Sequence, residues 1–108
     1  MKLIELVNYF RKGNSFEGFC KKESLNLESE VIEIFMQKPF DIWTNVVFFE
    51  IEMTKGNIKI MKDNIVYYYL FDSFYFLDVI NDSNEGQNLL LSDEEISKKL
   101  ILYATNDA

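Results

Sequence analysis

Carboxylates and aromatic rings are the side chains of this chain that are best suited to binding chemistry, and they gather in one stretch. From Asp63 to Ser97 the sequence carries eight acidic residues and seven aromatic residues, and neither lysine nor arginine. Negative charge beside large contact surfaces is suited to docking a basic macromolecule. The candidate partner-binding residues are Asp72, Asp78, Asp82, Glu85, Tyr68 and Tyr75. The stretch has five other aromatic residues, and most of them are expected in the core: Tyr67, Tyr69, Phe71, Phe74 and Phe76.

Folding accounts for some of these acids and leaves others unexplained. Asp63 belongs to a turn sequence, and the run from Asp93 to Glu95 suits the positively polarised first turn of a helix. Asp78 and Asp82 are four residues apart, so they repel each other on one helix face. A basic partner would remove that repulsion.

Enzymatic chemistry is disfavoured by what the chain lacks. There is no histidine and Cys20 is the single cysteine, so the common nucleophile and base pairs and the commonest metal ligand are missing. Phosphate-binding glycine loops and calcium loops are absent as well. Glu50 and Glu52 could form a carboxylate pair on one strand face, but a cross-strand bond to Lys59 is the simpler expectation. We expect no enzyme activity, no cofactor and no metal site.

The distribution of charge restricts the partner and the compartment. The net charge is −7; residues 1–62 carry nine acidic and nine basic residues, whereas residues 63–108 carry nine acidic residues and two lysines. Such a field attracts basic macromolecules and repels nucleic acid and anionic lipid. A lone cysteine indicates a reducing compartment, and no stretch resembles a signal peptide or a membrane span. We therefore expect a cytoplasmic protein.

The first third of the chain predicts three helices. Apolar residues at helical spacing predict one over residues 2–11, which Gly13 ends, and Ser15 begins a short second one. The segment 29–37 fits a strand nearly as well as a helix, because it is rich in β-branched residues. We favour the helix, which Ser29 can cap.

Residues 46–71 predict a three-stranded antiparallel meander. Two turn sequences, the second at 63–64, give one consistent register in which Ile60 lies between Ile51 and Tyr67. One face of the meander is expected to be buried, with Ile51, Met53, Ile58, Ile60, Tyr67 and Tyr69. The other face is also apolar, so a helix of the chain or a partner should cover it. Its apolar residues are Phe48, Met61, Val66, Tyr68 and Leu70.

Two further helices complete the prediction. Asp72 caps a helix that ends near Asn81, a polar loop follows to Asn88, and Ser92 starts the last helix with a capping box. The sequence therefore predicts an α+β fold in a single domain, 1–108. A short three-stranded β-meander packs in it against N-terminal and C-terminal helices.

A family resemblance is carried by three segments: Glu30–Asp41, Phe48–Glu52 and Leu91–Ala108. They resemble segments of small immunity proteins from bacterial contact-dependent growth inhibition systems, and the likeness extends over most of the chain. The resemblance implies a cytoplasmic antidote that neutralises the toxin domain at the C-terminus of a surface-delivered effector, frequently a nuclease. It supplies no motif for the binding residues, which follow from the charge pattern alone.

The leading hypothesis joins the charge pattern to this resemblance. The chain would be an acidic immunity protein that binds a basic nuclease toxin domain, an RNase rather than a DNase, and occupies or abuts its substrate cleft. When free, it would be a monomer or a weak dimer. The alternative is a structural or adaptor protein that forms homodimers through its apolar strand face.

Overall fold

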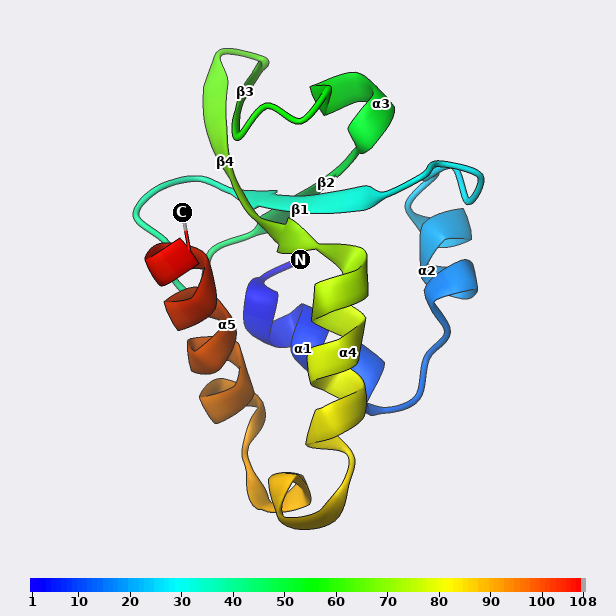
Figure 1. The fold of residues 1–108 in the computed structure, drawn as a ribbon, viewed down its shortest axis with the longest axis vertical. Coiled ribbons are helices and arrows are strands. Elements are labelled where there is room, and N and C mark those ends of the chain that lie inside the picture. The colour runs from blue at the N-terminus through cyan, green and yellow to red at the C-terminus, as the bar shows by residue number, and fades with distance from the viewer. Residues whose placement is uncertain (108) are drawn as a thin grey trace.

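A four-stranded antiparallel sheet forms the centre of the fold (Figure 1). The computed structural model describes the backbone of residues 1–107 and the side chains of residues 1–106. The order of strands across the sheet is β2–β1–β4–β3. They span Ile32–Met36 (β1), Val46–Glu50 (β2), Lys59–Lys62 (β3) and Ile65–Asp72 (β4). The predicted α+β class is confirmed, but the predicted number of three strands is wrong, because β1 adds a fourth, internal strand.

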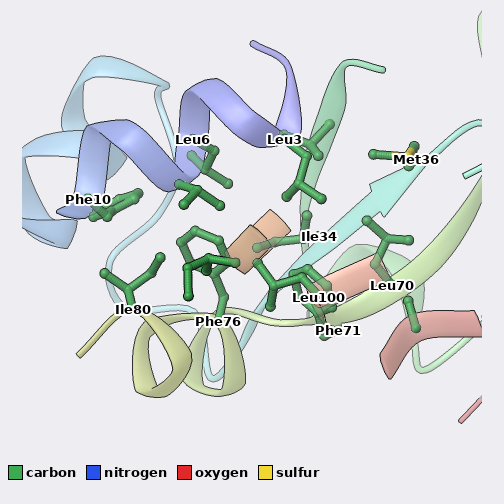
Figure 2. Close-up of a cluster of buried hydrophobic side chains, with 14 of the residues drawn as sticks. Leu3, Leu6, Phe10, Ile34, Met36, Leu70, Phe71, Phe76, Ile80 and Leu100 are labelled. Carbon is green, nitrogen blue, oxygen red and sulfur yellow. The ribbon is translucent and has the colours of Figure 1, made fainter. Parts of the chain in front are cut away.

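Three helices pack against one face of this sheet and enclose the main hydrophobic core. They are α1 (Leu3–Arg11), α4 (Ser73–Ser83) and α5 (Asp93–Asp107). Figure 2 shows side chains from all three helices and from the sheet meeting there, among them Leu6, Phe76, Leu100, Ile34 and Leu70. Full burial of one such side chain stabilises a fold by about 1.5–3 kcal/mol. This core therefore fixes which side of each helix faces solvent.

The two helices predicted at the start of the chain are confirmed. α1 buries its four apolar residues at helical spacing, Leu3, Leu6, Val7 and Phe10. α2 (Phe16–Lys22) begins after Ser15, whose side chain accepts the N–H of Gly18 at 3.0 Å. Such a cap satisfies a backbone donor that the helix itself leaves without a partner.

The two helices predicted in the second half are also confirmed. Asp72 caps α4 by accepting the N–H of Tyr75 at 2.8 Å. Ser92 and Glu95 form the predicted capping box of α5, in which each side chain accepts the backbone N–H of the other at 3.1 and 3.0 Å. The backbone N–H of Ser92, and after it the Ser92 side chain, hold the pKa of Glu95 below its usual value by hydrogen bonding to its carboxylate. The loop between the helices contains a short 3-10 helix, η1 (Gly86–Leu90).

The segment Ile32–Met36 is a strand, and the helix predicted over residues 29–37 is wrong. β1 pairs with β2 on one side and with β4 on the other, and all five of its residues are buried. Ser29 does not cap a helix; its hydroxyl donates to the carbonyl of Val31 at 3.0 Å and to the carboxylate of Glu52. An almost continuous apolar run is typical of a strand covered on both faces, and pairing with two neighbours outweighs helical spacing.

The first strand of the predicted meander ends earlier than expected. β2 stops at Glu50, and Ile51–Thr54 form the short helix α3. The N–H of Ile51 donates to the carbonyl of Val31 at 2.9 Å, and the hydroxyl of Thr54 donates to Glu33. β2 consequently pairs with β1 instead of β3, so the predicted register of Ile51 against Ile60 is wrong.

The predicted turn at Asp63 and Asn64 is confirmed. Both residues have positive φ angles, 53° and 66°, as a two-residue hairpin turn of type I′ requires. β3 and β4 pair so that Ile60 lies opposite Tyr67, which is the predicted register. The predicted burial of this face is wrong. Ile51, Ile60, Tyr67 and Tyr69 are only half-buried. Two further residues, Met53 and Ile58, are 64% and 68% exposed. They lie in and after α3, outside the strands that would have buried them.

The second apolar face of the predicted meander is covered over part of its length. Leu70 is buried in the main core, and the ring of Phe48 packs edge-on against Phe19 of α2 at a centroid distance of 5.0 Å. Met61, in β3, is 69% exposed. Helices of the chain thus cover the base of this face, and the β3 end of the hairpin stays open.

Candidate functional site

Two carboxylates and one aromatic ring form an exposed row on α4. Phe74, Asp78 and Asp82 follow one another at intervals of four residues, which places them on one side of the helix. All three are exposed, and the side chain of Phe74 is 60% accessible. Phe76 and Ile80 on the other side of α4 lie in the core. We call the exposed row the acidic stripe.

The stability of the fold does not explain the two aspartates of the acidic stripe. Among the described residues neither of them takes part in an ion pair, and α4 has no basic residue in its last turn. Asp82 lies in that turn, where the negative end of the helix dipole disfavours a carboxylate by about 0.3–1 kcal/mol. Repulsion between Asp78 and Asp82 adds to this cost.

Arg11 holds the end of α4 against the start of α5. Its guanidinium donates to the carbonyls of Ser83 and Leu91 at 3.3 and 2.8 Å, and it forms an ion pair with Asp93 at 3.0 Å. The arginine side chain is only 12% exposed, so these partners within the fold satisfy its charge. The contact fixes the backbone next to the acidic stripe without neutralising the stripe.

Further acidic and apolar groups lie at the same end of the molecule. Glu85 is exposed just before η1, and Leu89 and Leu90 within η1 are 57% and 86% exposed. Figure 1 shows η1 at the turn where α4 ends and α5 begins. A hollow of about 230 Å³ opens beside it, with Asp82 and Lys99 in its lining. Carboxylates next to exposed leucines are suited to contact with another protein.

The other predicted contact residues lie at different places. The ring of Tyr75 stacks on Tyr103 of α5, with ring centres 3.8 Å apart, so it faces the neighbouring helix. Asp72 lies at the opposite end of α4 from Asp82, and helix capping accounts for it. Tyr68 lies on β4, where the ammonium group of Lys38 is 4.4 Å from its ring centre. Three of the predicted acids therefore share one region: Asp78, Asp82 and Glu85.

Phe74 was expected in the core, and that prediction is wrong. Phe71 and Phe76 are buried as predicted, while Phe74 points to the solvent side of α4. The signal that identifies it is its spacing of four residues from Asp78 and eight from Asp82. A residue at that spacing shares the polar side of an amphipathic helix.

The carboxylate pair considered from the sequence does not form. Glu50 accepts the N–H of Asn26 at 2.9 Å, whereas Glu52, in α3, accepts the hydroxyl of Ser29 and the N–H of Glu30. These hydrogen bonds hold the pKa of Glu52 below its usual value and replace the bond expected with Lys59. The two glutamates thus serve to attach the segment before β1.

Other features bear on candidate chemistry. Cys20 lies in the core, and burial raises the pKa of its thiol, which disfavours the reactive thiolate. Among residues 1–106, whose side chains the structure describes, no group of three or more histidine, cysteine, aspartate or glutamate side chains is placed to hold a metal ion. The helices within residues 1–107 are too short or too polar to cross a membrane.

No protein-family model, curated protein or solved structure matches this chain. Its function is therefore inferred from the chemistry of its own surface. Among the predicted contact residues, the exposed carboxylates that lie together are those of the acidic stripe and of Glu85 beside it.

Proposed function

We propose that this chain is an immunity protein that binds and neutralises a basic toxin domain through the acidic stripe. The observation that carries the proposal is the exposure of Asp78 and Asp82 where both lower the stability of α4. Folding alone favours neutral or basic residues there, whereas a cationic partner removes the cost. Phe74 in the same row supplies an aromatic contact of the kind that dominates binding energy at interfaces.

A nuclease domain fits this surface because its substrate carries a negative charge at every nucleotide. Its cleft must present cationic groups to phosphates. The carboxylates of Asp78, Asp82 and Glu85 would take the places of phosphates and exclude the nucleic acid. Attraction between the two surfaces also raises the association rate, toward about 10⁸ M⁻¹s⁻¹ at low salt.

An RNase is the proposed target, and the cytoplasm is the proposed compartment. An RNase toxin meets its substrate there, so its antidote has to be present in the same compartment. The unpaired thiol of Cys20 is compatible with a reducing environment.

The test first asks whether a gene next to that of this chain encodes a large secreted effector, and then uses the C-terminal domain of that effector. We expect the triple variant D78N/D82N/E85Q to lose about 100-fold in affinity at low salt, since three charge pairs at an interface are worth about 3 kcal/mol together. The dependence of the dissociation constant on salt should weaken in parallel. Calorimetry at several salt concentrations measures both quantities, and a nuclease assay measures the inhibition.

The matched control is E23Q/E28Q/E30Q, which removes the same charge from exposed residues remote in sequence from the acidic stripe. It should change the affinity by less than about threefold. Equal affinity and an equal salt dependence for the stripe variant and the original chain would refute the electrostatic mechanism. A neighbouring effector without a basic C-terminal domain would contradict the proposed target.

A further inference from the structure

A second surface, of opposite charge, lies near the other end of α5. It is a groove of about 620 Å³ between the segment after β1, the β3–β4 hairpin and the last turns of α5. Its lining includes Lys38, Phe40, Lys59, Tyr68 and Thr105, and we call it the lysine groove. About 18 Å of helix separates Thr105 from the first residue of α5, which lies at the acidic end of the molecule.

Two ammonium groups converge on one tyrosine in the lysine groove. The Nζ atom of Lys38 lies 4.4 Å from the centre of the Tyr68 ring, and the Nζ atom of Lys59 lies 6.0 Å from it. Among the described residues neither lysine belongs to an ion pair, although the chain has 18 acidic residues and only 11 basic ones. A cation–π contact holds an ammonium group in place without neutralising it. Both charges therefore remain available to an anionic group from outside.

A second hollow, of about 550 Å³, shares the lining residue Phe40 with the lysine groove. Trp43 and Leu102 also line it, and charged residues complete its lining: Asp41, Glu94 and Lys98. The side chains of Trp43 and Leu102 are 56% and 59% exposed. Exposed tryptophan beside other large apolar side chains is typical of surfaces that bind another chain.

We propose that the lysine groove and the hollow beside it bind a segment of a partner protein that carries a carboxylate next to a large apolar side chain. The carboxylate accepts hydrogen bonds from the ammonium groups of Lys38 and Lys59, which fixes its position. The apolar side chain packs among Phe40, Trp43 and Leu102 and contributes most of the affinity. The site is distinct from the acidic stripe and does not depend on the function proposed for that stripe.

Other occupants complement this surface less well. A two-fold contact between copies would bring two unpaired lysines from each copy into one interface, with no unpaired acid opposite them. The acids at the rim are engaged already, because Asp41 accepts the N–H of Trp43 at 2.7 Å and Glu94 pairs with Lys98 at 3.2 Å. The net charge of −7 repels nucleic acid, and it also repels an acidic segment from the rest of the surface.

The test is selection of peptides from a random display library against the intact chain, with the variant K38E/K59E as counter-selection. We expect the selected peptides to contain aspartate or glutamate next to leucine, phenylalanine or tryptophan. Synthetic versions should bind K38E/K59E at least about 10-fold more weakly than the original chain. The control K12E/K21E, with the same change of charge at exposed lysines outside the groove lining, should keep the affinity within about twofold.

Several results would overturn the proposal. Selected peptides without a preference for acidic residues would do so. Binding to K38E/K59E as tight as to the original chain would also do so. If K38E/K59E does not fold, K38Q/K59Q takes its place in this comparison. On titration with peptide, amide resonances of Phe40 and Thr105 should shift; shifts confined to Asp78 and Asp82 would count against the site. If sedimentation detects a dimer of the original chain and only monomer of K38E/K59E, a second copy is the occupant and the proposal is refuted.

Discussion

The acidic stripe and the lysine groove both combine aromatic and charged side chains, but the charge is negative in the stripe and positive in the groove. The stripe has the exposed ring of Phe74 and the groove has the half-buried rings of Phe40 and Tyr68, and the charged groups of both form no ion pair among the described residues. The stripe lies on one element, α4, whereas the groove is assembled from the segment after β1, the β3–β4 hairpin and α5. One chain with a strongly negative net charge thus has a local surface on which two positive charges dominate.

The difference between the two regions lies in how far apart their residues are in the sequence. Phe74, Asp78 and Asp82 are related by helical spacing, so a single periodic pattern relates them. Lys38 and Lys59 are 21 residues apart and meet at Tyr68 only because β4 pairs with both β1 and β3. Net charge and periodicity therefore identify the first kind of surface and miss the second.

The largest expected effect is the loss of stability when Arg11 no longer holds the end of α4 against the start of α5, next to the acidic stripe. Replacing Arg11 by methionine leaves Asp93 without its ion pair and two carbonyls without their donor, so we expect a loss of about 2–4 kcal/mol in the free energy of unfolding. Urea denaturation measures this loss. Hydrogen exchange should increase more in residues 84–91 than around the lysine groove.

The control for this prediction is Lys12→Met, an exposed neighbour of Arg11, which should change stability by less than about 0.5 kcal/mol. Equal losses in the two variants would show that Arg11 does not hold the acidic end. A uniform increase in hydrogen exchange would show that the two ends of the molecule do not respond separately.

The next effect separates the two surfaces by their partners. Trp43→Ala should weaken binding of an acidic peptide by about 2 kcal/mol, or about 30-fold, and leave binding of a basic domain unchanged. Phe74→Ala should have the reverse pattern, because its ring belongs to the acidic stripe. Both side chains are more than half exposed, so neither change should unfold the protein. Calorimetry with both partners measures the pattern, and parallel losses for one variant would mean that the surfaces are coupled.

A smaller effect distinguishes two aspartates of the same helix. Asp72→Ala should lower the free energy of unfolding by about 1 kcal/mol, because the N–H of Tyr75 loses its capping acceptor. Asp82→Ala should raise it by about 0.3–1 kcal/mol, because a carboxylate at the negative end of the helix dipole is removed. Denaturation curves of the free protein decide this. A destabilising Asp82→Ala would mean that folding, and not binding, explains this acid.

The last prediction concerns high pH and Tyr69, which also lines the lysine groove. Burial, followed by the charges of Asp72 and Glu33, raises the pKa of Tyr69 to about 12 from its ordinary value of 10. Because the folded pKa lies above the unfolded one, the neutral ring stabilises the fold fully below pH 10, and this contribution is lost as the pH rises through about 12. The decline in stability between these values should be shallower in Tyr69→Phe. An identical decline in both proteins would show that Tyr69 does not contribute to it.

The fold could be predicted from the sequence where local interactions decide it. The helix starts at Ser15, Asp72 and Ser92 were all predicted, because a capping hydrogen bond joins residues within one turn. The strand at Ile32–Met36 was not predicted, because its helical spacing is nearly as good as its strand pattern. Pairing with β2 and β4 on either side decides between them, and no local pattern contains that pairing.

The candidate site shows the same division. Asp78, Asp82 and Glu85 were predicted from charge and spacing, and they lie on α4 and in the loop that follows it. Tyr68 was predicted to lie with them. It lies in β4 instead, where the ammonium groups of Lys38 and Lys59 contact its ring. The sequence does not predict the exposure of Phe74, because an aromatic side chain favours burial while its helical position places it on the polar side of α4.

The sequence by itself determined the four helices α1, α2, α4 and α5, the Asp63–Asn64 turn and the excess of acid in the second half, because these depend on neighbours in the chain or on composition. Only the tertiary structure decided that β1 is a strand, that α3 interrupts the meander and that the lysine groove exists. The physical reason is that strand pairing and surface grooves join residues distant in sequence. A short segment does not contain both partners of a strand pair or both sides of a groove. The interactions between them form only when the sheet and the helices pack together.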